Sequence, residues 1–203
     1  MELRFRRLLF GATALLSALI ADNAHAGPDF LEGTRETRPP MGYIQFCTDN
    51  PAECRSTAMR PAAVELTPAR LAELVEVNRR VNAHIRPVTD RELWNVMERW
   101  TFPVDGMGDC EEYVLMKRQI LMDSGWPEQT LLITVVLDTR GDGHAVLAAR
   151  TSRGDLILDN QDPEVRLWSQ TSYRFVKRQA DWNPTQWVGI SGPQNLVHTA
   201  SGN

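Results

Sequence analysis

The pattern of apolar and polar residues changes once along the chain, near Pro127. Before that residue, apolar side chains recur every three or four positions, which is the spacing of helices with one buried face. After it, short β-branched runs alternate with turns, which is typical of strands. Helices followed by strands predict an α+β fold in which N-terminal helices pack on an antiparallel β-sheet.

The first long helix is expected from Pro68 to about Ile85, with Thr67 as its N-cap and Pro87 beyond its end. Its apolar positions and the two asparagines on the same face are Leu71, Leu74, Val75, Asn78, Val81, Asn82 and Ile85. Amides that face a core must find partners. We expect them to bond neighbouring backbone, although one of them would alternatively support an active-site wall.

Two more helices are predicted before Pro127, the first over residues 90–100. The second follows Gly108-Asp-Cys-Glu-Glu-Tyr113 and runs to Ser124, where Gly125 and Pro127 close it. Its expected buried stripe is Tyr113, Met116, Ile120 and Leu121. The loop of residues 101–108 brings apolar side chains towards Cys110.

The strands are expected at residues 130–137, 144–150, 155–159 and 173–177, with a fifth or edge strand at 187–190. Residues 152–154 form the turn between the second and third strands. Residues 27–42 are rich in Pro, Gly, Thr and charge and are expected to be an extended lead-in. The polar tail from Ser191 is expected to be frayed.

The first 26 residues read as a secretory signal peptide. Three arginines precede an apolar run over residues 8–21, and Ala24-His25-Ala26 is a small-residue cleavage site. Its removal would leave a single domain over residues 27–203, located in the periplasm or secreted. The net charge is −4 and no basic tract stands out, which argues against nucleic acid as a partner.

The three cysteines divide into a pair and a single residue. Cys47 and Cys54 are separated by six residues, and export would permit a disulfide between them. Cys110 is left over at a helix start, where the helix dipole favours a thiolate over a thiol. It is therefore a candidate nucleophile, and the alternative is a buried, inert thiol.

A thiol nucleophile needs a base, and the imidazole of that base needs an acceptor to orient it. His144 opens one predicted strand and Asp159 closes the next, so the two residues are neighbours if these strands form a hairpin. The competitors are His84 and His198 for the base, and Asp155 and Asp162 for the acceptor. The pattern alone leaves this choice open.

Three carboxylates, Asp109, Glu111 and Glu112, flank Cys110. Oxygen ligands of this kind suit calcium. An acidic run at a helix start also complements the helix dipole without any ion. Both interpretations stay open.

The stretch at residues 108–113 resembles the bacterial transglutaminase-like cysteine peptidases, including the LapG-related periplasmic proteases. The likeness extends from Phe46-Cys47 through Trp187. It is carried by the pair Cys47 and Cys54, Val81-Asn82, Trp100 with Pro103, Gly-Asp-Cys-Glu-Glu-Tyr113, Gly143-His-Ala-Val146, Leu158-Asp-Asn160 and Phe175-Val-Lys-Arg178.

The resemblance implies a papain-like, transglutaminase-like core with Cys110 as nucleophile, His144 as base and Asp159 as its orienting carboxylate. It also implies calcium dependence, with Asp109 and Glu111 as ligands and Glu112 standing where Asp is common. No organic cofactor is expected. The implied substrate is a protein, such as a surface adhesin, and the implied regulator is a cyclic-dinucleotide-sensing membrane receptor that restrains the enzyme.

The expected activity is that of an exported cysteine endopeptidase working through a thioester intermediate. The same acyl-enzyme could be resolved by an amine, which would make the protein an amide-transferring transglutaminase. A rival from another class is a non-catalytic, calcium-gated binding module that keeps the fold.

Overall fold

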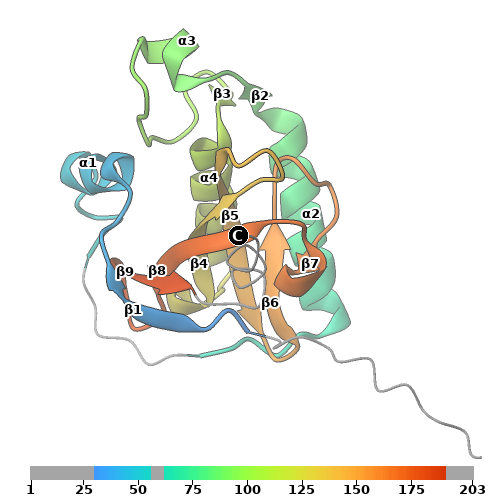
Figure 1. Cartoon of the computed structure of the whole chain (residues 1–203). Helices are drawn as coiled ribbons and strands as arrows, with labels where there is room; N and C mark the ends of the chain where they lie inside the picture. The colour runs from blue at the N-terminus through green and yellow to red at the C-terminus, as the bar shows by residue number, and fades with distance from the viewer. Residues whose placement is uncertain (1–29, 56–61, 191–203) are drawn as a thin grey trace, which may run out of the picture.

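The computed structural model describes residues 30–55 and 62–190. Its central element is a seven-stranded sheet with the strand order β1-β9-β8-β4-β5-β6-β7, in which every neighbouring pair is antiparallel. Helices α2 and α4 lie beside each other against the sheet (Figure 1). The predicted α+β class, with helices packed on an antiparallel sheet, is confirmed.

The sheet strands are β1 (Gly33–Thr37), β4 (Leu131–Leu137), β5 (Gly143–Thr151), β6 (Gly154–Leu158), β7 (Arg166–Leu167), β8 (Arg174–Ala180) and β9 (Asn183–Ile190). The helices are α1 (Met41–Asp49), α2 (Pro68–His84), α3 (Asp90–Trp94) and α4 (Cys110–Asp123), with short 3₁₀ turns η1 (Glu128–Thr130) and η2 (Trp168–Gln170). A small parallel ladder joins β2 (Arg86–Pro87) to β3 (Met107–Gly108).

Alternation along the strands divides the core into two clusters, one on each face of the sheet. Ala145, Leu147 and Ala149 of β5 face the larger cluster, which also holds the buried side chains of α2 and α4. Val146 and Ala148 face the smaller cluster, together with Leu31 and several aromatic residues of the C-terminal half. The helices and Cys110, the candidate nucleophile, therefore lie on the same face of the sheet.

Helix α4 is more deeply enclosed than its sequence pattern predicts. Tyr113 and Leu121 are buried as expected, but Met116 and Ile120 are only half-buried. Lys117 and Arg118 are buried instead. The reason is that α2 covers one side of α4 and the sheet covers another, so a single apolar stripe does not describe it.

Helix α2 agrees with its predicted bounds, and the Thr67 hydroxyl accepts the Arg70 N–H at 3.2 Å as its N-cap. Leu74, Asn78 and Val81 are buried as expected. Leu71 and Val75 are not, with 38% and 43% of their surface exposed, so the predicted buried stripe was too wide.

The local structure departs from the sequence analysis in three places. Residues 33–37 of the extended lead-in form strand β1, which pairs with β9, so the strand expected at residues 187–190 is an inner strand and not an edge. The helix expected over residues 90–100 ends at Trp94, because Asn95 adopts a left-handed conformation with φ of 58°. Strand β7 was not anticipated at all.

The disulfide between Cys47 and Cys54 is formed in the structure and links α1 to the turn that follows it. Cys110 is the free cysteine among the described residues. The predicted signal peptide over residues 1–26 and the tail from Ser191 lie outside the described residues. Within residues 30–55 and 62–190, no helix has both the length and the hydropathy that a membrane span requires.

Candidate active site

Cys110 is the first residue of α4, and the residues just before it fix its position. The Asp109 N–H donates to Glu112 Oε2 at 2.8 Å, and the Thr101 N–H donates to Glu112 Oε1 at 3.1 Å. Gly108 packs so closely that an added Cβ would lie 2.5 Å from the Glu112 side chain. Only glycine fits there, so Gly108 and Glu112 together hold the start of α4 against the preceding loop.

Cys110 and His144 line the same cleft, which has a volume of about 710 Å³. One wall comes from the α3 loop, with Met97 and Trp100, and another from residues 38–41 ahead of α1. Lys177 of β8 reaches the wall formed by residues 38–41 and donates to the Arg38 carbonyl at 3.0 Å. The cleft therefore brings together the predicted nucleophile and the predicted base.

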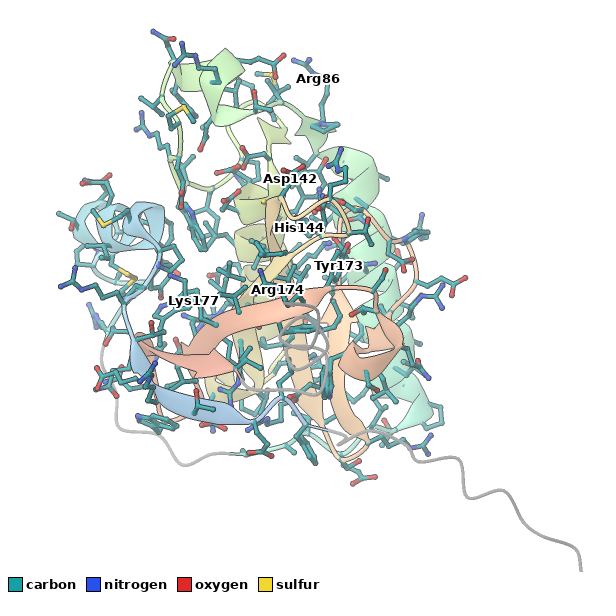
Figure 2. The ribbon with its side chains drawn as sticks, in the orientation of Figure 1. Arg86, Asp142, His144, Tyr173, Arg174 and Lys177 are labelled. Carbon is teal, nitrogen blue, oxygen red and sulfur yellow. A yellow bond between two sulfur atoms is a disulfide. The ribbon has the colours of Figure 1, made fainter. Side chains whose placement is uncertain are left out.

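His144 and Asp159 are hydrogen-bonded, with 2.8 Å between His144 Nε2 and Asp159 Oδ1. The register Leu147↔Leu158 makes them diagonal neighbours at the ends of β5 and β6, as the hairpin predicted. Each is buried, with 4% and 2% exposed. Figure 2 shows His144 in the middle of the molecule, next to Tyr173.

Asp159 is the acceptor that the sequence left undecided. Burial raises its pKa, but the hydrogen bonds from His144, from the Gln161 N–H and from Tyr173 outweigh that effect, so its pKa lies below the usual value. The competitor Asp155 lies near the other end of β6 and contacts Arg150 and Leu31. An ionised Asp159 is the correct partner for an imidazole that must be oriented.

Cys110 lines the same cleft as Ala145 of β5. Its thiol donates to Glu111 Oε2 at 2.9 Å. His144 Nδ1, the ring nitrogen that does not contact Asp159, lies 3.4 Å from Gln161 Nε2. Among the described residues, Cys110 and His144 therefore do not hydrogen-bond to each other: the thiol bonds to Glu111, and the imidazole contacts Asp159 and Gln161.

The expectation that the helix dipole favours a thiolate at Cys110 is wrong for this structure. Burial raises the pKa of the thiol well above its usual value, and the neighbouring Glu111 carboxylate raises it further. The effect of the dipole falls off within one turn and is worth about 1 kcal/mol, whereas burial beside a carboxylate shifts a pKa by several units.

Four carboxylates meet at the start of α4. Ligand atoms of Asp109, Cys110 and Glu111 lie within 4.8 Å of one another, and so do those of Asp90, Asp109 and Glu112. Burial, and then Asp109, raise the pKa of Glu111 to about 9. For Glu112, burial is again the main cause and the pKa rises to about 8.

Two of these carboxylates carry oxygens that are buried without a hydrogen-bond partner among the described residues, Asp90 Oδ1 and Asp109 Oδ1. The other oxygen of Asp90 accepts the Arg99 N–H, and the other oxygen of Asp109 accepts the Asp90 N–H at 3.2 Å. Asp90 was missed from the sequence, because it precedes Cys110 by twenty residues and reaches the site through α3.

Two further residues that contact Asp159 were not singled out as site residues. Tyr173 donates its hydroxyl to Asp159 Oδ2 at 2.5 Å, and no motif marks it. Asn82 donates to the Asp159 carbonyl at 2.7 Å, which matches the interpretation that an asparagine of α2 supports the active-site wall. Asn78 holds the same loop through the Asp162 and Pro163 carbonyls.

Comparisons with known proteins place this chain in a family. Residues 33–195 match the family model of the bacterial transglutaminase-like cysteine proteinases. No curated protein matches the chain. The solved structures that are similar include LapG of Legionella pneumophila in three forms.

The calcium-bound LapG is 26% identical over 56% of this chain, with a TM-score of 0.48, and the chain spans 66% of its length. A second LapG structure is 24% identical over 66% of this chain and 76% of its own, with a TM-score of 0.50, which supports the shared fold. An EGTA-treated LapG covers the same shares at 23% identity and a TM-score of 0.49. The match to the family model covers most of the chain, and the protein therefore belongs to the bacterial transglutaminase-like cysteine proteinases.

Proposed function

We propose that this protein is an exported cysteine endopeptidase that cleaves a cell-envelope protein, such as a surface adhesin, with Cys110, His144 and Asp159 as its catalytic residues. The observation that carries the proposal is the convergence of three distant segments. Cys110 and His144 line the same cleft, and His144 is hydrogen-bonded to a buried Asp159. Membership of a cysteine proteinase family supports the same reaction class.

In the proposed reaction, His144 Nδ1 accepts the thiol proton and Cys110 Sγ attacks the carbonyl carbon of the scissile peptide bond. The Cys110 N–H, at the first position of α4, has no carbonyl within the helix to accept it and can donate to the oxyanion. Collapse of the intermediate expels the amine, which takes the proton from His144. Water then hydrolyses the thioester and regenerates the thiol.

The resting arrangement needs one change before this chemistry, because the thiol faces Glu111 and must turn towards His144. A divalent cation held by Asp90 and Asp109 fits their unpartnered buried oxygens, Glu111 lies beside Asp109 as a further oxygen ligand, and calcium prefers such ligands. When bound, it would compensate the negative charge that now raises the pKa of the thiol. Glu112 has both oxygens engaged by backbone N–H groups and is better placed as a structural residue.

Replacement of Cys110 by Ala is the direct test. Surface and secreted proteins from a strain that lacks this protein would be incubated with the purified wild type and with Cys110→Ala, and new fragments compared by mass spectrometry. We expect fragments only with the wild type, and nearly equal melting temperatures. Cleavage by the variant would refute the assignment.

A second measurement separates hydrolysis from amide transfer and tests the cation. Products formed with added amine would show its mass if the acyl-enzyme transfers to amines, and a free carboxyl terminus if it is hydrolysed. A chelator should abolish cleavage and lower the melting temperature if calcium is required. The membrane receptor expected from the family remains a proposal that needs its own binding experiment.

A further inference from the structure

The carboxylate of Asp159 is held at both of its oxygens. Oδ1 accepts two bonds, from His144 Nε2 at 2.8 Å and from the Gln161 N–H at 2.9 Å. Oδ2 accepts the Tyr173 hydroxyl at 2.5 Å. Asp159 itself is 2% exposed, so these protein groups supply the hydrogen bonds of its carboxylate.

Tyr173 reaches this carboxylate from a separate part of the fold. It stands immediately before β8, whereas His144 lies on β5 and Asp159 follows β6. Its ring also lies against the imidazole, with 5.6 Å between centroids and an angle of 52° between planes. Figure 2 shows the two side chains as neighbours. One residue thus touches both members of the His–Asp pair.

We propose that Tyr173 is a positioning residue, which locks the rotation of the Asp159 carboxylate so that Oδ1 always receives the Nε2 proton of His144. This inference rests on the proposed catalytic triad. A carboxylate fixed at Oδ2 cannot turn away from the ring, so the neutral imidazole keeps its proton on Nε2. Nδ1 then stays unprotonated and can accept the proton of Cys110.

The surroundings of the ring agree with this role. Gln161 Nε2 lies 3.4 Å from His144 Nδ1, and an amide donor beside that nitrogen fits a ring whose proton is on Nε2. Burial, and then Asp159, raise the pKa of Tyr173, so its hydroxyl remains a donor throughout the neutral range. A tyrosine that served only to fill space would not need its hydroxyl.

The test compares Tyr173→Phe with a matched control, Tyr113→Phe. Tyr113 is buried, whereas Tyr173 is half-buried, and like Tyr173 it donates its hydroxyl to a single acceptor, the Ile85 carbonyl at 2.7 Å, but no contact joins it to His144 or Asp159. Full mature chains labelled with ¹⁵N-histidine would be examined by NMR, with the His144 signals assigned by their loss in His144→Gln. The rate of Cys110 alkylation by iodoacetamide would be measured on the same samples in calcium-containing buffer.

In the wild type and in Tyr113→Phe, we expect one His144 tautomer with the proton on Nε2. In Tyr173→Phe, we expect a mixture of tautomers and an alkylation rate that is roughly tenfold lower at neutral pH, the size of effect that one lost hydrogen bond to a charged group produces. Retention of a single Nε2 tautomer in Tyr173→Phe overturns the inference.

The two arms also separate this inference from the proposed function. The NMR measurement does not involve the thiol, and it decides the role of Tyr173 by itself. An alkylation rate that is unchanged in His144→Gln would instead count against the proposed pairing of Cys110 with His144.

Discussion

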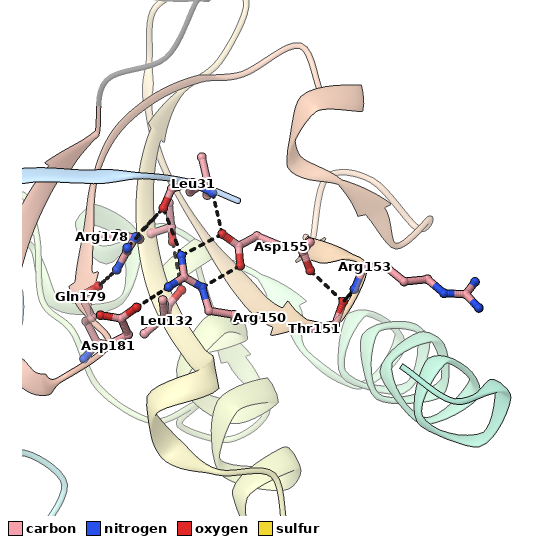
Figure 3. Close-up of polar contacts among 11 residues, drawn as sticks. Leu31, Leu132, Arg150, Thr151, Arg153, Asp155, Arg178, Gln179 and Asp181 are labelled. Carbon is pink, nitrogen blue, oxygen red and sulfur yellow. Dashed lines mark hydrogen bonds and ion pairs between the residues drawn. The ribbon is translucent and has the colours of Figure 1, made fainter. Parts of the chain in front are cut away.

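The two ends of β5 hold buried charge in opposite ways. Near its start, the acidic cluster of Asp90, Asp109, Glu111 and Glu112 gathers groups of like sign around Cys110. Near its end, the ion-pair cluster of Arg150, Asp155, Arg178 and Asp181 combines both signs around the backbone of Leu31 (Figure 3). The same sheet therefore carries one cluster that lacks counter-charge and one that supplies its own.

In the ion-pair cluster, each polar group has a partner. Arg150 contacts Asp155 at 3.1 Å, Asp181 and the Leu31 carbonyl, and the Leu31 N–H donates to Asp155 at 2.7 Å. Arg178 donates to the same Leu31 carbonyl at 3.2 Å. Burial lowers the pKa of Arg150, but Asp155 and Asp181 outweigh it, so its pKa lies above the usual value.

The acidic cluster differs because some of its oxygens lack hydrogen-bond partners and its carboxylates lack a counter-charge. Asp90 and Asp109 each keep a buried oxygen without a partner among the described residues, and the pKa of Glu111 is raised to about 9. Buried carboxylates persist at a cost unless a proton or a cation neutralises them. The difference teaches that burial of charge alone does not mark a functional site, whereas burial without compensation makes the acidic cluster a candidate for one.

The largest effect is expected from breaking the compensated cluster. Arg150→Met would leave Asp155 and Asp181 buried without their shared counter-charge, which typically costs about 3–5 kcal/mol of unfolding free energy. Urea unfolding measures this directly. Arg153→Met is the matched control, because the Arg153 side chain points away from the cluster (Figure 3).

The alkylation rate of Cys110 in the folded fraction of Arg150→Met should equal that of the wild type, since the cluster holds the fold and not the site. A loss below about 1 kcal/mol, comparable to the control, would show that Arg150 and the two carboxylates are solvated and that the contrast between the clusters is unfounded.

The acidic cluster should respond to pH in a defined direction. The pKa of Glu111 is about 9 when folded against an ordinary value of 4.5, so the folded state binds more protons between these values. Stability without calcium is then greatest below pH 4.5 as far as this group is concerned, and is lost as pH rises towards 9. Glu111→Gln should remove that slope and stabilise the chain by about 2–4 kcal/mol at pH 8.

Thermal unfolding in EGTA and in calcium, at several pH values, measures this prediction. Calcium should stabilise the wild type more than Glu111→Gln, because the variant offers one charged ligand fewer. Glu65→Gln, an exposed position away from the cluster, serves as control. Equal responses of all three proteins to calcium would mean that the cluster holds no cation.

Site residues could be paired from the sequence where the strands that carry them are close along the chain. His144 and Asp159 could be paired in advance, because a two-residue period and a tight turn at residues 152–154 determine which strand ends are neighbours. The choice of Asp159 over Asp155 needed the register, which places Asp155 beside Arg150. Local rules therefore predicted the hairpin and its ends.

Features that depend on distant packing escaped prediction. Asp90 reaches the acidic cluster through α3, and Tyr173 reaches Asp159 from the segment before β8, and neither has a local signal. The pKa of Cys110 was predicted with the wrong sign, because the helix start is visible in the sequence while its burial beside Glu111 is not. Side-chain surroundings decide such quantities, and they arise only after folding.

Lys117 is a third case of buried charge, a single ammonium, and its replacement is expected to change the free energy of unfolding least. It is fully buried in α4, its ammonium has no hydrogen-bond partner among the described residues, and the charge of Asp159 only partly offsets the effect of burial on its pKa. Burial lowers its pKa to about 7 from 10.5, so the unfolded chain binds more protons between these values and stability rises with pH across that window. Lys117→Met should abolish this rise and stabilise the chain by about 1–3 kcal/mol at pH 6.

The stabilisation by Lys117→Met should shrink as pH increases from 7 to 10, since the wild-type lysine is then neutral in the folded state. Gln119→Met, on the same helix with its amide bonded at the surface to Asp123, should show no such pH dependence. Urea unfolding at pH 6, 8 and 10 distinguishes the two. A variant that is less stable than the wild type at pH 6 would mean that the ammonium is compensated after all, and that Lys117 belongs with Arg150 and not with the uncompensated charges.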